Sequence, residues 1–218
     1  MVKKQQAETG TEVMSVQERI KSRLANIDAT TQQPSGQNIS VKGKIFRLPD
    51  GKTSPGPLNC IIVDYINMNA YYEQGYVEGE FSPPDCTAIG REIKLMKPAS
   101  TVEKPVNPDC ESCDFNKFES RGRGKACSNN ILLAVLPEDF TIDSELYTLK
   151  ISATALKPWA NYVRELSAMA VDPVQVVTSL SFEESLSYPS VRFKQIGGNE
   201  RLEDISPFLT KADMLLTS

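Results

Sequence analysis

The chain has 218 residues, enough for one domain of ordinary size with appendages or for two small domains. Its apolar fraction of 40% and charged fraction of 24% are typical of a globular protein and exclude a wholly disordered one. The net charge of −4 excludes a protein that coats nucleic acid over its entire surface, but it is compatible with a local basic face. No apolar run is long enough to cross a bilayer, and the polar N-terminus lacks the core of a signal peptide. We therefore expect an intracellular protein without a membrane partner.

Residues 1–38 are predicted to be a flexible tail that contains a short amphipathic helix. Ser15 and Glu18 have the spacing of a capping box, which marks the start of a helix. One apolar stripe then follows at helical spacing, formed by Val16, Ile20, Leu24 and Ile27. This stripe indicates a helix that packs on its own domain or on a second copy of the chain.

From residue 39 apolar residues alternate with a period of two, and continuous apolar runs lie at 58–65 and 131–136. Together these patterns predict strands at 39–45, 58–65, 131–136, 146–153, 174–182 and 191–196. An Asp-Gly turn within residues 48–52 is expected to join the first two strands in a hairpin. Helices are predicted at about 158–170, where Trp159 anchors the apolar face, and at 207–216. Residues 39–200 are therefore expected to form an α+β domain, an antiparallel barrel or sheet of the oligonucleotide-binding type, followed by a C-terminal helix or tail at 201–218.

Four of the five cysteines lie within residues 83–130, which we expect to be a long insertion between strands. Cys110 and Cys113 form a Cys-x-x-Cys knuckle, Cys86 precedes it, and Cys127 follows a Gly- and Arg-rich turn. Two such pairs can place four sulfurs at the corners of the tetrahedron that structural Zn²⁺ prefers. The chain has no histidine, so an all-protein site needs four thiolates, or three and a carboxylate in place of Cys86. The alternatives are a disulfide pair or buried thiols, and we expect the fifth cysteine, Cys60, to be a buried thiol within a strand.

An insertion of this length has little apolar content of its own to bury. A structural zinc ion would supply the missing stability, because metal binding contributes directly to folding. The sequence therefore predicts one structural Zn²⁺ within residues 83–130.

The same region is locally basic and rich in aromatic residues. Four cations, which would contact phosphates, are Lys117, Arg121, Arg123 and Lys125. The rings that would stack on bases are Tyr71, Tyr72, Tyr76, Phe115 and Phe118. The alternative is that the rings pack the metal loop onto the sheet and that the cations belong to a solvated loop.

The sequence does not predict an enzyme. It has no histidine to act as a general base, no phosphate-binding Gly-rich loop and no Gly-x-Ser-x-Gly nucleophile motif. Its acidic residues are scattered rather than grouped as two-metal phosphoryl chemistry requires.

Residues 110–120 and 122–129 resemble a family of small tailed-bacteriophage proteins, in which Cys-x-x-Cys-x-x-Asn precedes Gly-Lys-Gly-Lys-Ala-Cys. The resemblance extends to residues 83–86 and 132–137, and more loosely to 156–163 and 176–182. It implies a single-stranded DNA-binding protein that acts in phage DNA replication or recombination in the cytoplasm of the infected bacterium. It does not extend to a strongly acidic C-terminal tail, because residues 202–218 are only mildly acidic.

A second interpretation is a phage structural or protein-interaction module stabilised by zinc. The acidic net charge, the N-terminal amphipathic stripe and the apolar C-terminal segment support it. The expected partners are single-stranded DNA under the first interpretation, and phage replication proteins, a host enzyme or a second copy of the chain under the second.

Overall fold

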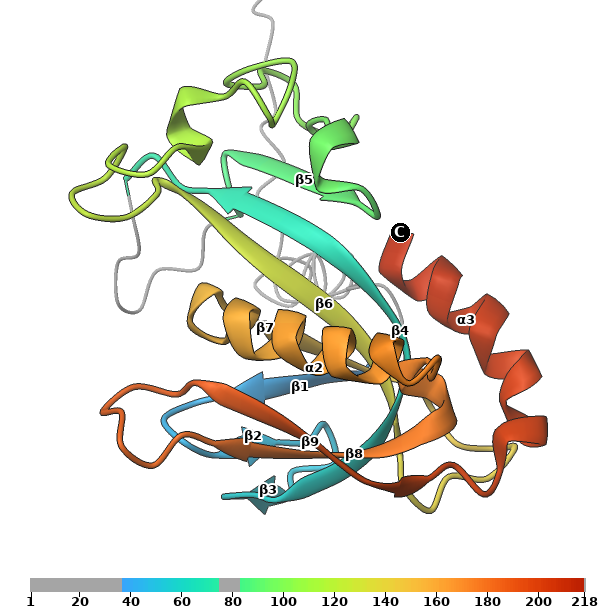
Figure 1. The fold of residues 1–218 in the computed structure, drawn as a ribbon. Coiled ribbons are helices and arrows are strands. Elements are labelled where there is room, and N and C mark those ends of the chain that lie inside the picture. The colour runs from blue at the N-terminus through green and yellow to red at the C-terminus, as the bar shows by residue number, and fades with distance from the viewer. Residues whose placement is uncertain (1–36, 75–82, 218) are drawn as a thin grey trace, which may run out of the picture. The chain divides into compact units, whose positions relative to one another are not determined.

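The computed structural model describes residues 37–74 and 83–217, which belong to one unit with an α+β fold. The expected N-terminal helix and Tyr76 lie outside these residues. A curled mixed sheet is covered by two α-helices (Figure 1). The strands are β1 (Gln37–Val41), β2 (Phe46–Arg47), β3 (Thr53–Ser54), β4 (Leu58–Tyr71), β5 (Cys86–Gly90), β6 (Cys127–Pro137), β7 (Tyr147–Ile151), β8 (Val176–Phe182) and β9 (Val191–Gly198).

The helices of the described residues are α2 (Leu156–Ala168) and α3 (Ser206–Thr217), close to the predicted positions. Pro158 lies in the first turn of α2, where the missing N–H removes no intrahelical hydrogen bond. Short 3₁₀ turns are η1 (Ile93–Leu95), η2 (Asp114–Asn116), η3 (Ala153–Ala155), η4 (Pro173–Gln175) and η5 (Leu202–Ile205). No helix of residues 37–74 and 83–217 is long and apolar enough to cross a membrane.

The sheet has the order β3-β2-β1-β7-β6-β4-β8-β9, and β5 pairs with the end of β4. It is mixed rather than wholly antiparallel, because β1 runs parallel to β7 with Ile39 opposite Leu149. The predicted hairpin between residues 39–45 and 58–65 is wrong. The Asp-Gly turn instead joins the short strands β2 and β3, and the partner of β4 over most of its length is β6. Local turn chemistry identified the turn, but it did not determine which strands pair.

A β-bulge divides the long strand β4 into two parts. The register with β6 shifts between Ile62 and Asp64, so Val63 is an extra residue on β4. The shift places Ile62 and Tyr65 on one face of the sheet, whereas Ile61 and Ile66 belong to the other. Beyond the bulge, the face of Tyr65 therefore carries Asn67, Asn69 and Tyr71 by alternation.

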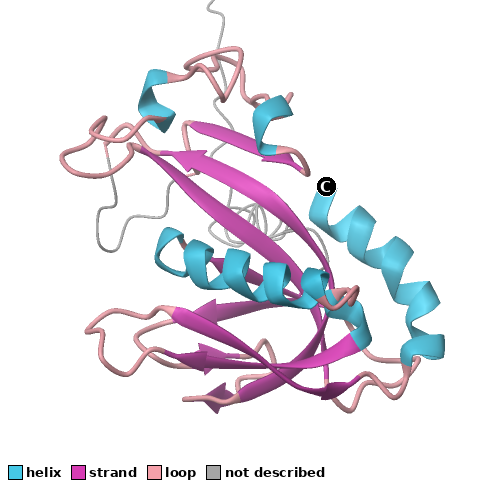
Figure 2. Cartoon of the chain, in the orientation of Figure 1, coloured by secondary structure: helices cyan, strands magenta, loops and turns pink. Residues whose placement is uncertain are grey.

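Two apolar cores lie on opposite faces of this sheet, one under each helix (Figure 2). The first contains Leu133 and Leu149 of the sheet with Trp159 and Leu166 of α2. Trp159 is 4% exposed and meets Tyr65 edge to face at 5.0 Å between ring centroids, so it is the core anchor that the sequence predicts.

The second core lies on the opposite face, under α3. Ile61 and Leu136 of the sheet pack there against Phe208 and Ala212 of the helix. Because both faces of β4 and β6 are covered, these strands read as continuous apolar runs in the sequence.

Beyond the part covered by α2, β4 and β6 extend as a ribbon toward β5 and residues 91–126 (Figure 1). We call residues 83–126 the cysteine segment and the remaining described residues the sheet body. The cysteine segment lies at the end of the ribbon far from β2 and β3.

Candidate functional site

The pairing of the strands brings Cys86 and Cys127 to the same level of the sheet. Tyr71, the last residue of β4, is opposite Cys86 of β5 on one side and Cys127 of β6 on the other. Residues directly opposite each other on neighbouring strands point to the same face. The two thiols therefore flank the Tyr71 ring on one face, although 41 residues of sequence separate them.

The loop after β5 returns Cys110 and Cys113 to this face. The N–H of Cys110 donates to the carbonyl of Met96 at 3.1 Å, and Met96 is buried with Ala88 and Cys110. The Asp109 carboxylate accepts from the N–H of Ser112 at 3.2 Å, which shapes the Cys-x-x-Cys turn. The hydrogen bonds from Ser112 lower the pKa of Asp109, so this carboxylate is ionised when it holds the turn.

All four cysteines line one small cavity of about 20 Å³, together with Tyr71 and Phe115. None of them forms a disulfide. Burial, and after it the negative charges of Cys110, Cys113 and Cys86, raise the pKa of the Cys127 thiol to about 11. Three other thiols are thus close enough to Cys127 to act on it electrostatically.

The four thiols suit a zinc ion in kind, and all four line one cavity. Soft sulfur ligands around a closed cavity are the donors of structural Zn²⁺ sites, and the cavity is about the size that one water or ion needs. As they stand, no three His, Cys, Asp or Glu side chains of residues 37–74 and 83–217 form a group that could hold a metal. Cys86 and Cys127 lie two strand spacings apart, about 10 Å between backbones. Ligation of one ion would draw these two sulfurs together over Tyr71.

The fifth cysteine has a different environment. Cys60 is 2% exposed in the core under α2, and burial raises the pKa of its thiol to about 12. It is the inert buried thiol that the sequence predicts.

A ring of hydrogen-bonded amides connects the cysteines to the ribbon. The Asn69 side chain lies near enough to the Cys110 thiol to lower its pKa, against the larger effect of burial, and its Oδ1 accepts from Nδ2 of Asn129 at 2.7 Å. Nδ2 of Asn129 also donates to Oδ1 of Asn116 at 2.9 Å, and Nδ2 of Asn116 donates to the Cys110 carbonyl at 2.8 Å. The ring thus begins and ends at Cys110.

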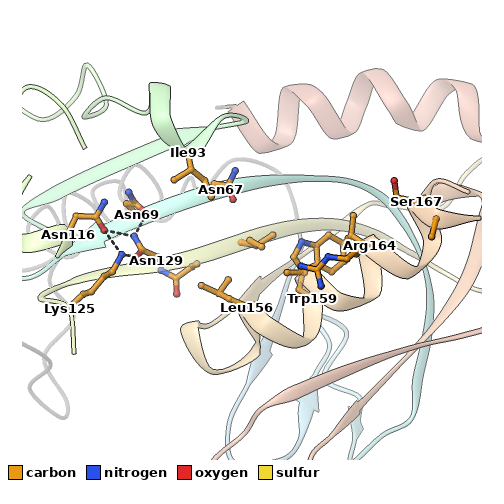
Figure 3. A pocket seen from close by; sticks show the side chains of 15 residues that line it. Asn67, Asn69, Ile93, Asn116, Lys125, Asn129, Leu156, Trp159, Arg164 and Ser167 are labelled. Atoms are coloured by element: carbon orange, nitrogen blue, oxygen red, sulfur yellow. Dashed lines mark hydrogen bonds between the residues drawn. The ribbon is translucent and has the colours of Figure 1, made fainter. Parts of the chain in front are cut away.

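Lys125 is held by this asparagine ring. Its Nζ donates to Oδ1 of Asn129 at 2.8 Å and to Oδ1 of Asn116 at 3.3 Å (Figure 3). The same Nζ lies 5.2 Å from the centre of the Phe118 ring, which is 76% exposed. An ammonium with two acceptors retains one N–H for a further acceptor. A cation and an exposed ring are therefore fixed side by side.

An open groove of about 850 Å³ lies beside the asparagine ring, between α2 and the cysteine segment (Figure 3). Its walls include apolar side chains of α2, its floor carries the strand asparagines, and Ile93 of η1 lies on the opposite side. Lys125 lies toward one end and Arg164 of α2 toward the other. None of the described residues that line the groove is acidic, although the chain as a whole has a net charge of −4.

The aromatic residues that the sequence associated with base stacking occupy different environments. Tyr71 is 8% exposed and stacks on Phe115 with ring centroids 4.7 Å apart, so each ring has one face covered by the other. Tyr72 is half-buried, and Phe118 is the most exposed of the described members of this set. The Tyr71–Phe115 pair therefore packs the cysteine segment onto the sheet, whereas Phe118 remains accessible.

The basic residues are equally varied. Lys117 is paired with Asp114 at 2.6 Å, and Arg121 donates to the carbonyls of Tyr72 and Glu73 at 2.8 and 3.2 Å. Arg123 is exposed, and Lys125 belongs to the asparagine ring. Among residues 37–74 and 83–217, only Lys117 of the four cations forms an ion pair with a carboxylate. Arg121, Arg123 and Lys125 do not.

Sequence reasoning missed the groove and its asparagines. Asparagine is depleted in strands, yet Asn67, Asn69 and Asn129 all lie within β4 and β6. Two asparagines two residues apart in an apolar strand were a usable signal of a polar patch on one face. The position of Arg164 in the groove could not be predicted from the sequence, because an exposed arginine on a helix is ordinary.

Comparison with protein-family models, curated proteins and solved structures finds no significant match to this chain.

Proposed function

We propose that this protein binds single-stranded DNA through the ribbon end of the sheet and the cysteine segment, and that a structural Zn²⁺ stabilises this segment. We further propose, from the resemblance of residues 83–137, that it acts in bacteriophage DNA replication or recombination in the host cytoplasm. The proposal is for a binding protein rather than an enzyme, because the chain has no histidine and none of the nucleotide-hydrolysing motifs.

The observation that carries the proposal is the convergence of the exposed Phe118 ring, Lys125 and the acid-free groove at one end of the sheet. Proteins that bind single strands without strong sequence preference combine cations that follow the backbone with rings on which bases stack. In a chain with a negative net charge, a surface without acidic groups is the part suited to a polyanion.

The strand order supports an open barrel of the oligonucleotide-binding type. Strands β4, β6, β7, β8 and β9 are neighbours in the order β7-β6-β4-β8-β9, and α2 connects the third of them to the fourth. We propose that they are the five strands of such a barrel, with β1 to β3 beside β7 where the barrel would close. The cysteine segment then occupies the connection between the first and second strands, one of the loops that contact ligands in this fold.

The proposed metal would be held by Cys110 and Cys113 with Cys127 and Cys86. When bound, Zn²⁺ would supply folding free energy to a segment that has few apolar contacts. The hydrogen bond from Nδ2 of Asn116 to the Cys110 carbonyl would help to position that ligand, as outer hydrogen bonds do in other metal sites.

The experiment is a fluorescence-anisotropy titration of the zinc-loaded protein with labelled oligo-dT across a salt series. We expect affinity to fall steeply with salt, because each neutralised phosphate releases counterions. Arg123→Ala should reduce the slope of log affinity against log salt by about 0.7, one phosphate contact. Lys52→Ala, on the exposed turn between β2 and β3, is the matched control and should leave the slope unchanged. Absence of binding to any single strand at low salt would refute the proposal.

A second candidate function is a protein-interaction module. Ile93 and Leu95 of η1 are 64% and 69% exposed, and Met214 of α3 is 67% exposed. Exposed apolar side chains that gather in one place mark protein contacts. Association with a protein partner or a second copy that is insensitive to salt, without binding of single strands, would favour this candidate.

A further inference from the structure

The groove between α2 and the cysteine segment has the dimensions and chemistry of a nucleotide site. Its volume of about 850 Å³ lies within the range of small-molecule pockets, about 300–1,000 Å³. Such pockets combine apolar walls with a few fixed polar groups, and both are present here. The apolar wall is formed by Leu156, Trp159, Ala160 and Val163 of α2.

The polar groups of the groove are fixed before any ligand arrives. Asn69 and Asn129 are immobilised by the asparagine ring, and Nδ2 of Asn67 donates to the carbonyls of Gly90 and Arg91 at 3.2 and 2.8 Å. The orientation of the Asn67 amide is therefore fixed, and its Oδ1 is an acceptor for a ligand. Lys125 retains one N–H that can donate to a ligand. A site with such preorganised groups loses less conformational entropy on binding.

The charge distribution identifies the occupant. Lys125 and Arg164 lie toward the two ends of the groove, and no described lining residue is acidic. Neither cation forms an ion pair with a carboxylate of the described chain. An apolar peptide would leave both charges without a counterpart, whereas a nucleotide strand has phosphates at both ends of each sugar.

We propose that this groove is a base-binding subsite, in which one or two bases of a bound single strand lie against the α2 wall while Lys125 and Arg164 contact the flanking phosphates. This proposal rests on the proposed single-strand binding and goes beyond it. The basic loop of the cysteine segment would bind backbone charge and offer the Phe118 ring for stacking, whereas the groove adds a separate place for bases.

The test compares oligo-dT of about 16 nucleotides, near the upper site size of one such barrel, with an abasic oligonucleotide of equal length. Wild-type protein should bind oligo-dT at least about tenfold more tightly, since base stacking contributes about that much per base. Trp159 is the single tryptophan and lines the groove, so its emission should change with oligo-dT and not with the abasic strand.

Ala160→Phe is the variant that fills the groove. Ala160 is exposed on α2, so a ring there occupies the groove without entering the core. The variant should bind oligo-dT less tightly than wild type and the abasic strand equally tightly, so that only the preference due to stacking on Phe118 remains. Met169→Phe places the same ring at an exposed position just after α2, away from the groove, and should behave as wild type.

Arg164→Gln provides an independent measurement that requires no added bulk. It should lower the slope of log affinity against log salt by about 0.7, the loss of one phosphate contact on a single strand.

The outcomes separate the two proposals. Equal affinity of wild type for both strands, or an unchanged preference in Ala160→Phe, overturns the base-binding subsite and leaves single-strand binding in place. Failure of wild type to bind either strand overturns the proposed function and the subsite together.

Discussion

The sheet body and the cysteine segment are stabilised by different means. The sheet body has two large apolar cores, which use the side chains of every long strand and of both α-helices. The cysteine segment contributes to two small clusters, one that it shares with Tyr71 and Cys127 of the ribbon and one around Cys110. Its other contacts are polar, chiefly the asparagine ring and the hydrogen bonds of the Asp109 turn.

The two regions therefore differ in the kind of contact on which their stability depends. Apolar burial makes the sheet body cooperative, because its contacts are nondirectional and numerous. The cysteine segment depends on a few directional contacts, so loss of any one of them should lower the free energy of local unfolding of this segment. We therefore expect substitutions in the two regions to change different measured quantities.

The largest effect is expected from removal of a proposed zinc ligand. Cys113→Ser should abolish stoichiometric zinc binding, because structural sites owe about 10–16 kcal/mol of apparent binding free energy to a complete ligand set. Amide hydrogens of residues 83–126 should then exchange rapidly while those of the sheet body stay protected. Zinc content and hydrogen exchange followed by mass spectrometry measure both.

Cys60→Ala is the matched control for that variant, because Cys60 is a buried thiol of the sheet body. It should retain zinc and lower only global stability. Full zinc occupancy in Cys113→Ser would contradict the proposed metal site.

Phe208→Ala tests the sheet body. Phe208 is fully buried under α3 and meets Phe140 edge to face at 5.7 Å, so its truncation should cost about 3–5 kcal/mol of unfolding free energy. Urea denaturation measures this loss, and zinc content should be unchanged. Leu209→Ala, one residue further and 44% exposed, should change stability by no more than about 0.5 kcal/mol. Equal effects of the two variants would mean that α3 does not anchor the second core.

Asn129→Leu tests the asparagine ring. The substitution removes the donor to Asn69 and Asn116 and the acceptor of Lys125, and it should cost about 1–3 kcal/mol of local stability. Faster hydrogen exchange in the cysteine segment, with an unchanged urea midpoint of the sheet body, is the expected result. Asn161→Leu, at an exposed position of α2, is the control. Unchanged exchange in Asn129→Leu would show that the ring does not stabilise the segment.

Tyr162→Phe gives a smaller effect with a pH signature. The Tyr162 hydroxyl is 2.6 Å from the buried Thr178 hydroxyl, and loss of this bond should cost about 0.5–1.5 kcal/mol. Burial raises the pKa of Tyr162 in the folded protein, so the unfolded chain releases this proton first, near pH ~10. The stability linked to Tyr162 is therefore present below that pH and lost as pH rises through the folded pKa. Urea midpoints between neutral and alkaline pH should fall less steeply in Tyr162→Phe, and identical slopes would contradict this assignment.

Asp213→Asn should have the smallest effect. Arg91 follows β5 and pairs with Asp64 at 2.6 Å and with Asp213 of α3 at 2.7 Å, which connects the cysteine segment to the sheet body. The Asp213 carboxylate is 61% exposed, so the pair should contribute at most about 1 kcal/mol. Thermal melts at low and high salt check this, because screening should abolish the difference between variant and wild type. A loss that persists at high salt would indicate that Asp213 acts through packing.

Most of the longer elements of this protein could be predicted from the sequence, whereas the short strands β2, β3 and β5 and the second part of β4 could not. Continuous apolar runs located β6 and the first part of β4, alternation located β7, the helical stripe around Trp159 located α2, and the low apolar content of residues 83–130 identified an inserted segment. These features are local, because the spacing of apolar side chains reflects the geometry of each element. The grouping of the four cysteines at one cavity was also expected from the sequence, because the Cys-x-x-Cys turn is short.

Only the tertiary structure decided which strands pair and what the ribbon presents. The parallel pairing of β1 with β7 and the β-bulge at Val63 leave no mark in the spacing of residues. The bulge nevertheless determines that Asn67 and Asn69 face the groove, because one extra residue exchanges the faces of everything that follows it. The groove combines residues from β4, η1, the cysteine segment, β6 and α2, which are distant in sequence. Its existence depends on long-range packing, which a local pattern of residues does not specify.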